Sequence, residues 1–172
     1  MTGVASGGTR GWDAYAPLYD EHHEHLFRVA LLLCHGQRAA AEDAVAETFI
    51  KVFHAWSHTD IAHFFAYARR TLVRVTIGQQ RRRQVAAAYL ERHGTIDDGV
   101  VTVEDQVAIS STTFEALELL PARQRTAVVL RYYEDLPYDQ IADLMGVTTG
   151  TVKAQVSVGL GRLRQVMIGA QP

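Results

Sequence analysis

The chain has 172 residues, of which 48% are hydrophobic, and a formal net charge of -2. This length can bury one medium core or two small ones, and two small helical domains fit best because the apolar residues recur at helical spacing. The small net charge means that any basic surface must be local, while the single cysteine, Cys34, excludes an intramolecular disulfide and any multi-cysteine zinc site.

The N-terminal segment predicts a disordered tail followed by a helix. Residues 1–15 are rich in glycine, serine and threonine and lack the hydrophobic core of a signal peptide. No apolar run in the chain reaches the roughly 18 residues of a membrane span, so we expect a cytoplasmic protein that does not enter the membrane. A helix is predicted from Pro17 to near Gly36, with one apolar stripe. Its members are Leu18, His22, Leu26, Val29, Ala30 and Leu33.

A second helix is predicted over residues 39–56, with two different faces. The buried face holds Val45, Phe49, Val52, Phe53 and Trp56. The opposite face carries Asp43, Glu47, Ile50, Lys51 and His54. Because single hydrophobic residues are common on protein surfaces, Ile50 among charged neighbours fits a plain solvated face as well as a protein-docking face.

The third predicted helix, residues 61–83, combines an apolar face with a basic and aromatic one. The first face holds Ile61, Phe65, Ala68, Leu72, Val75 and Gln79, and the second holds His63, Tyr67, Arg70, Arg74 and Arg81. No acidic residue occurs between Ile61 and Leu90 to compensate the six arginines of this segment. Such a stripe suits a phosphate backbone, and Tyr67 or His63 could stack on an unpaired base. The alternative is a solvated helix end whose arginines complement the helix dipole.

Residues 85–110 are predicted to form a flexible acidic linker. Within the stretch 91–105, the acidic residues are Glu91, Asp97, Asp98, Glu104 and Asp105, against one basic residue, Arg92. Gly94 and Gly99 interrupt the helical periodicity. Such a linker either keeps two domains soluble or occupies a basic channel of a partner by mimicking nucleic acid.

The C-terminal block, residues 111–168, begins with two predicted scaffold helices. Ser111 or Thr112 can cap the first helix, whose apolar residues are Phe114, Leu117 and Leu120. Pro121 starts the second helix, whose expected core residues are Ala127, Val128, Leu130 and Tyr133.

Residues 136–166 have the layout of a DNA-reading helix-turn-helix. Ile141, Leu144 and Met145 predict a first helix, which ends at Gly146 because glycine tolerates a positive φ. Thr148 is a suitable N-cap for a second helix. The buried stripe of that helix is Val152, Val156, Leu160 and Leu163.

The outward face of this second helix is small and carries few donors. It holds Gly150, Ala154, Ser157, Val158 and Gly161, flanked by Thr151, Lys153 and Gln155. Small residues let a helix sit deep in a major groove, where Lys153, Gln155 and Ser157 can reach base edges or phosphates. Arg162 and Arg164 lie nearer the DNA backbone. An ordinary helical hairpin with a solvated face is the alternative.

Several motifs follow one another in a recognisable order. In the C-terminal block they are LPARQR, VLRYYEDL, IADLMGV and GTVKAQVSVGLGRLR, and in the first block LYDEHHEHLFRVA, AEDAVAETFIKVFHAW and YARRTLVR. The chain thereby resembles the extracytoplasmic-function (group IV) sigma factors of bacterial RNA polymerase, with region 2 at residues 16–84 and region 4 at residues 111–168. The RRTLVR motif is similar to the corresponding motif of actinobacterial SigE-like members.

The resemblance implies three working surfaces on an all-α protein. Docking on the clamp of the largest polymerase subunit would fall to Asp43, Glu47, Ile50 and Lys51. Recognition of the minus-10 element, with capture of a flipped base, would fall to residues 58–63, which include His63, and to Tyr67, Arg70, Arg74 and Arg81. The minus-35 element would be read by Thr148, Thr151, Lys153, Ala154, Gln155, Ser157 and Arg162. The linker would thread through the RNA exit path.

The resemblance also implies the partners: core RNA polymerase, through its clamp and flap, promoter DNA and an anti-sigma factor. A transcription initiation factor of this kind is not an enzyme and needs no cofactor. A stand-alone helix-turn-helix regulator is the alternative, but it leaves the arginine-rich third helix unexplained.

We expect no metal at the cluster of His22, His23 and His25, because neighbouring side chains on one helix point in different directions. Solvated or half-buried histidines are the expected state.

Four positions depart from the family pattern. Ala46 stands where a glutamine is common before the docking-helix glutamate, so clamp affinity would be weaker or shifted to neighbouring residues. Arg74 and Gly78 stand where an asparagine and an aspartate are common, so the family's minus-10 preference does not transfer to this chain. Pro137 replaces a serine or threonine cap, and proline is tolerated at a helix start.

Overall fold

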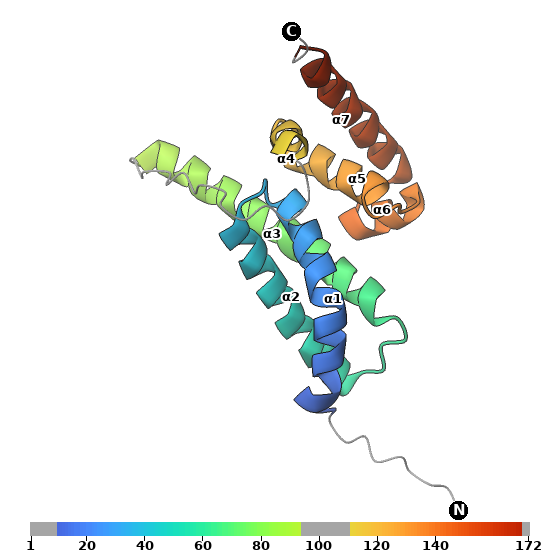
Figure 1. Cartoon of the computed structure of the whole chain (residues 1–172). Coiled ribbons are helices and arrows are strands. Elements are labelled where there is room, and N and C mark those ends of the chain that lie inside the picture. The colour runs from blue at the N-terminus through green and yellow to red at the C-terminus, as the bar shows by residue number, and fades with distance from the viewer. Residues whose placement is uncertain (1–9, 94–110, 170–172) are drawn as a thin grey trace, which may run out of the picture.

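The described part of the chain is a bundle of seven α-helices (Figure 1). The computed structural model describes residues 10–93 and 111–169. The helices are α1 (Trp12–Leu33), α2 (Arg38–His58), α3 (Phe64–His93), α4 (Ser111–Glu118), α5 (Ala122–Tyr132), α6 (Tyr138–Met145) and α7 (Thr149–Gly169). Neither of the two described ranges contains a strand, and the predicted all-α fold class is confirmed.

Helices α1, α2 and α3 pack along one another as an antiparallel bundle (Figure 1). A left-handed turn at His35 (φ 59°) and Gly36 (φ 69°) reverses the chain between α1 and α2. The Gly36 N–H donates a hydrogen bond to the Leu31 carbonyl at 2.9 Å, which satisfies an acceptor at the end of α1. The turn therefore sets the pairing of the first two helices.

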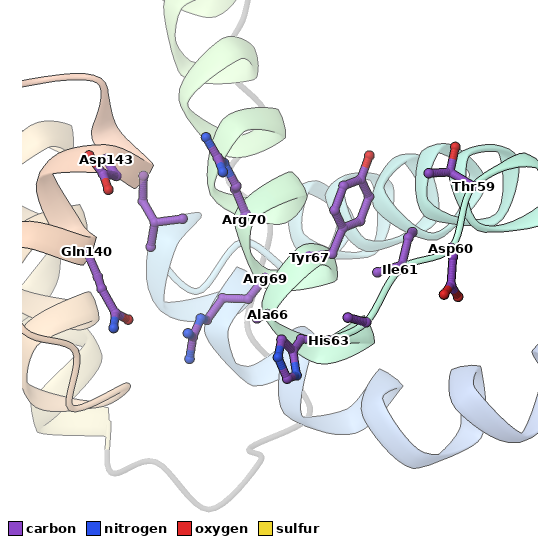
Figure 2. A pocket seen from close by; sticks show the side chains of 12 residues that line it. Thr59, Asp60, Ile61, His63, Ala66, Tyr67, Arg69, Arg70, Gln140 and Asp143 are labelled. Carbon is purple, nitrogen blue, oxygen red and sulfur yellow. The ribbon is translucent and has the colours of Figure 1, made fainter.

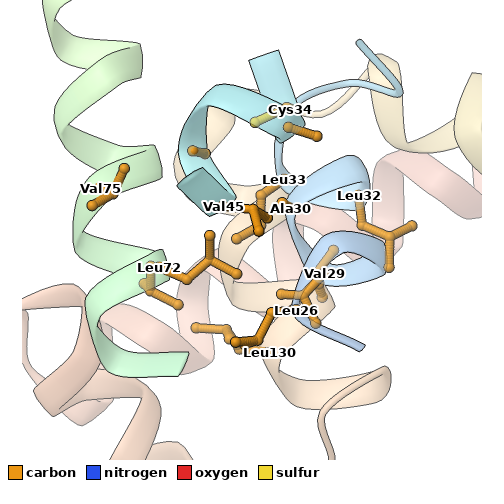
Figure 3. Packing of buried hydrophobic residues seen from close by; sticks show 14 of the residues in the cluster. Leu26, Val29, Ala30, Leu32, Leu33, Cys34, Val45, Leu72, Val75 and Leu130 are labelled. Atoms are coloured by element: carbon orange, nitrogen blue, oxygen red, sulfur yellow. The ribbon is translucent and has the colours of Figure 1, made fainter. Parts of the chain in front are cut away.

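The hydrophobic core continues from these three helices into the second block. Figure 3 shows Leu130 of α5 beside Leu26 and Val29 of α1 and Leu72 of α3. All four side chains are completely buried. Because full burial of such a side chain contributes about 2 kcal/mol, the shared contact holds the two blocks against each other.

Helix α1 begins at Trp12 rather than at Pro17, so the prediction of a disordered tail is wrong for residues 12–15. Tyr15 is completely buried, and its hydroxyl donates a hydrogen bond to the Phe49 carbonyl at 2.9 Å. Its ring centre lies 4.9 Å from that of Phe53. Pro17 removes one backbone donor at an exposed position near the helix start, and the aromatic packing outweighs that loss. Residues 1–9 lie outside the described ranges.

The first and last residues of helix α3 both differ from the predicted ones. It begins at Phe64 instead of residue 61 and runs to His93 instead of Arg83, so residues 85–93 of the predicted linker are helical. Three successive alanines, residues 86–88, favour this continuation, and neither glycine nor proline occurs between Arg83 and Gly94. The remainder of the predicted linker, residues 94–110, lies outside the described ranges.

The predicted apolar face of α3 is only partly correct. Ala68, Leu72 and Val75 are buried as expected, but Phe65 and Gln79 are half-buried. Phe64, Val73 and Thr76 are buried in addition. Helix α3 buries more than one face because α1 and α2 cover one side of it while α5 and α6 contact another.

Helices α5, α6 and α7 pack together as the predicted helix-turn-helix and its support. Gly146 adopts the left-handed conformation (φ 65°) after α6, and the Thr148 hydroxyl accepts the Thr151 N–H at 3.2 Å at the start of α7. Val152 and Val156 of the predicted stripe are buried. Tyr133, expected in the core, is 39% exposed because it lies just beyond the end of α5.

Two glycines of α7 should respond in opposite directions to alanine. A Cβ at Gly159 would lie 2.9 Å from Val128 Cγ2, where α7 packs on α5, whereas a Cβ at Gly161 would meet nothing within 4 Å. In a helix, alanine is favoured over glycine by about 1 kcal/mol. We expect Gly161→Ala to raise the free energy of unfolding by about 0.5–1 kcal/mol, and Gly159→Ala to lower it by about 1 kcal/mol because overpacking exceeds the helix gain. Urea unfolding checks both, and equal shifts would contradict the close α5–α7 contact.

Candidate nucleic-acid interface

The predicted minus-35 residues lie on α7 and the turn before it, and we call them the α7 face. Exposed members are Thr148, Lys153, Ala154, Ser157 and Arg162, while Thr151 and Gln155 are half-buried. The Lys153 ammonium lies 5.8 Å from the centre of the Tyr138 ring, a cation–π contact that joins α7 to the start of α6. The Gln155 Oε1 atom is buried and has no hydrogen-bond partner in the described part of the chain. The α7 face therefore consists mainly of small side chains, with hydrogen-bond donors along its edge.

The predicted minus-10 residues form an exposed stripe on and just before α3, which we call the α3 stripe. Its members are His63, Tyr67, Arg70, Arg74 and Arg81, all exposed. His63, Tyr67 and Arg70 line a groove of about 490 Å³ together with the segment that joins α2 to α3 (Figure 2). The opposite wall belongs to α6, through Gln140 and Asp143 (Figure 2). This wall was not predicted, because no pattern within α6 indicates contact with α3.

The predicted docking residues lie on the outer side of α2, which we call the α2 face. Asp43, Ile50 and Lys51 are exposed, and Ile50 is the most exposed of the large hydrophobic side chains described, at 70%. Glu47 is half-buried and accepts hydrogen bonds from Lys51 Nζ at 3.0 Å and Gln79 Nε2 at 3.2 Å. The hydrogen bond from Lys51 is the main cause that holds the pKa of Glu47 below its ordinary value.

A polar cluster around one buried carboxylate joins the first three helices to the second block. The Glu134 carboxylate is only 2% exposed and accepts hydrogen bonds from His25 Nε2 at 2.6 Å and Arg69 Nη1 at 3.2 Å. His25 belongs to α1, Arg69 to α3 and Glu134 to the segment after α5. We call these residues the Glu134 cluster. His25 is half-buried, as expected for the histidine group, but its partner Glu134 was not predicted.

A second polar contact between the blocks contains a buried arginine. Arg125 of α5 is completely buried, and its Nη1 atom donates hydrogen bonds to His35 Nδ1 at 2.5 Å and to the Leu120 carbonyl at 3.4 Å. Its Nε and Nη2 atoms have no hydrogen-bond partner among the described residues. Burial lowers the pKa of Arg125 to about 10, and burial beside Arg125 lowers the pKa of His35 to about 4. The imidazole is therefore neutral at pH 7.

The described residues contain no group of three or more histidine, cysteine or acidic side chains that could hold a metal ion. The Cys34 thiol is buried, and burial raises its pKa. None of the helices, as far as they are described, is both long and apolar enough to cross a membrane.

Two family profiles match the chain, and together they cover both helical blocks. Sigma-70 region 2 matches residues 18–98 and Sigma-70 region 4 matches residues 114–163. The chain is 31% identical to the ECF RNA polymerase sigma factor SigL of Mycobacterium tuberculosis, over 86% of this chain and 85% of that protein. It is 29% identical to SigE of Mycolicibacterium smegmatis, over 96% of this chain and 68% of that protein.

Solved structures share the fold of the whole chain. The sigma factor RpoE of Bartonella quintana, solved with the anti-sigma factor NepR, matches with a TM-score of 0.69 and 20% identity over 92% of this chain and 99% of that one. CnrH, solved with the cytosolic domain of CnrY, matches with a TM-score of 0.64 and 18% identity over 97% and 96% of the two chains. With both sigma-70 regions present and relatives above 30% identity, the chain belongs to the extracytoplasmic-function (ECF) RNA polymerase sigma factors.

Proposed function

We propose that this promoter-recognising sigma factor divides its work among the α2 face, the α3 stripe and the α7 face. The observation that carries the proposal is that a basic and aromatic stripe and a small-residue helix face occur on one chain and are both open to solvent. A stand-alone helix-turn-helix regulator would need only the α7 face. The α3 stripe with its uncompensated arginines favours a protein that also holds unpaired DNA.

The α7 face is proposed to read the minus-35 element. Thr148, Thr151, Lys153, Ala154, Gln155, Ser157 and Arg162 are the proposed contacts. The small outward side chains allow a close approach to the major groove, so Lys153 and Gln155 carry most of the direct base contacts. DNA shape supplies part of the remaining specificity.

The α3 stripe is proposed to hold the minus-10 element, and the α2 face to dock on the clamp of core polymerase. Tyr67 would stack on an unpaired base while Arg70, Arg74 and Arg81 hold the phosphates, and His63 lies at the same groove. On the α2 face, Asp43, Glu47 and Lys51 surround Ile50, which would supply an apolar anchor. Catalysis of RNA synthesis would belong to the polymerase, and the chain would work in the cytoplasm with it.

An anti-sigma factor is a further proposed partner, because the structural relative from Bartonella quintana was solved with one. The flap of the polymerase is the proposed contact of the second block. Both assignments follow from membership of the family.

The packed arrangement of the two blocks is proposed to be a resting state. The minus-10 and minus-35 elements lie about 25 base pairs apart, which is about 85 Å of B-DNA at 3.4 Å per base pair. A compact chain of this length has a radius of gyration of about 16 Å. One molecule can therefore reach both elements only after the second block leaves the first.

Substituting Lys153→Ala and Gln155→Ala together tests the division of labour. We expect transcription from promoters that require a minus-35 element to fall at least about tenfold, because base contacts of this kind contribute about 1–3 kcal/mol. Binding to core polymerase should remain unchanged. Gln165→Ala, at an exposed position further along α7, is the control and should leave both properties intact. Loss of core binding in the double variant would contradict the assignment.

A further inference from the structure

Two exposed histidines, His54 and His58, lie one helical turn apart at the end of α2. Residues four apart lie on the same side of a helix. Their ring centres are 4.9 Å apart, and the ring planes make an angle of 52°. Residues 55–57, between them, are half-buried or buried. The two imidazoles are therefore the part of this turn that faces solvent.

The backbone of the same turn orients the His58 ring. His58 Nδ1 lies 2.8 Å from the His54 carbonyl oxygen, and the Ser57 hydroxyl donates to that oxygen at 3.0 Å. Because a carbonyl oxygen only accepts, the neutral ring carries its proton on Nδ1 and keeps a lone pair on Nε2. Histidines that bind metals usually hold their other nitrogen in this way. Within the described ranges the His54 ring has no hydrogen-bond partner, so it is also free to bind.

The spacing of the two rings fits a shared metal ion. With a metal–nitrogen distance of about 2.1 Å, the centre of a bound imidazole lies about 3.2 Å from the ion. Two such ring centres are about 4.5 Å apart when the ligands form a right angle and about 5.2 Å apart at the tetrahedral angle. The observed 4.9 Å lies between these values. Two histidines at this spacing on one helix also form the core of known helical zinc motifs.

The charges next to the pair do not oppose a cation. Lys51, one turn before His54, lies 3.0 Å from the Glu47 carboxylate. Arg10, which packs against the end of α2, lies 3.2 Å from the Asp60 carboxylate. Each of these cations thus has an acid beside it, and a divalent ion meets no uncompensated positive charge from them.

We propose that His54 and His58 bind one divalent transition-metal ion, through one ring nitrogen of each residue. Imidazole suits zinc, nickel and copper ions, whereas magnesium and calcium prefer oxygen ligands. The described residues offer no group of three metal-binding side chains. Water therefore fills the other coordination positions, and the ion exchanges readily. The site lies one turn beyond Ile50 and does not depend on the role proposed for the α2 face.

The test is calorimetric titration of the metal-free full chain with Zn²⁺ in the presence of a large excess of Mg²⁺. We expect one ion per chain. Because the second imidazole binds from the same helix rather than from solution, His54→Gln and His58→Gln should each weaken binding at least about tenfold. The double variant should bind little more weakly than either single variant, since each of those already lacks the pair. His63→Gln, at an exposed histidine outside the pair, is the matched control and should keep the affinity.

Thermal unfolding provides a second measurement. An ion held by both rings binds only the folded helix, so Zn²⁺ should raise the Tm of the unsubstituted chain and leave that of the two single variants unchanged. Retained Zn²⁺ affinity in either single variant would overturn the pair as the site. An equal loss in His63→Gln would show binding by scattered histidines, and displacement of Zn²⁺ by Mg²⁺ would show oxygen ligands, and either result would overturn the inference. Circular dichroism establishes that each variant is folded.

Discussion

Replacing Glu134 by alanine should separate the two helical blocks. The substitution leaves Arg69, whose side chain is only 15% exposed, without its carboxylate. Removing one partner of a buried ion pair costs about 3 kcal/mol or more. We assign most of this cost to Arg69, since the His25 side chain is 43% exposed and water can replace its partner. Small-angle scattering should therefore report a larger radius of gyration for Glu134→Ala than for the unsubstituted chain.

A neighbouring substitution provides the control for Glu134→Ala. Asp135 is 95% exposed and pairs only with Arg131 among the residues that the structure describes, at 3.3 Å. Its φ of 48° favours asparagine over alanine, so Asp135→Asn is the matched variant. We expect this change to alter the free energy of unfolding by less than about 1 kcal/mol. An unchanged radius of gyration in Glu134→Ala would contradict the view that this cluster holds the blocks together.

The same substitution should strengthen binding to core polymerase if the packed arrangement is a resting state. A destabilisation of about 3 kcal/mol changes the ratio of open to packed molecules by about a hundredfold. Because only open molecules would be competent, the apparent dissociation constant should fall with the rising open fraction. Titration of labelled core polymerase with both proteins measures this effect.

Acidification from pH 7 to pH 4 should destabilise the folded chain by about 2 kcal/mol through His35. The pKa of His35 is about 4 in the folded chain and about 6.5 when unfolded, because burial and the neighbouring Arg125 disfavour its cation. Between these values the unfolded chain binds more protons, so this contribution is complete above pH 6.5 and is lost as the pH falls toward 4. The magnitude allows for screening by water at a half-buried ring.

The variant His35→Asn isolates this titration. Asparagine tolerates the left-handed conformation of position 35, where φ is 59°, and its side-chain oxygen can accept a hydrogen bond from Arg125. Urea unfolding at several pH values should give a steeper decline for the unsubstituted chain than for His35→Asn between pH 6.5 and pH 4. Parallel profiles for the two proteins would show that His35 does not carry the effect.

Local patterns in the sequence were sufficient to predict most helices and the outward faces of α2, α3 and α7. Apolar spacing, the Thr148 cap and the Gly146 turn all depend on neighbours within a few residues, so the sequence reports them directly. The start of α1 was not predictable in this way. Pro17 is a strong local signal for a helix start, and the burial of Tyr15 that overrides it depends on a contact with α2.

The contacts between the blocks escaped prediction for the same physical reason. No pattern in the sequence marks Arg125 or Glu134 for burial, and their partners are distant along the chain. His35 lies in the turn between α1 and α2, and Arg69 lies on α3. A charged residue is buried only where such a partner compensates part of its desolvation, and sequence spacing carries no record of that partner. The groove at α3 depends on the packing of α6 and was invisible for the same reason.

Run-off transcription tests the central claim most directly. Purified chain is added to sigma-free core RNA polymerase with fragments of genomic DNA, and a sigma factor of known activity establishes that the polymerase preparation is active. We predict discrete transcripts that require both the added chain and sequence at the minus-10 and minus-35 positions of the template. Absence of any promoter-directed transcript, with an active control, would contradict the assignment of this chain as a sigma factor.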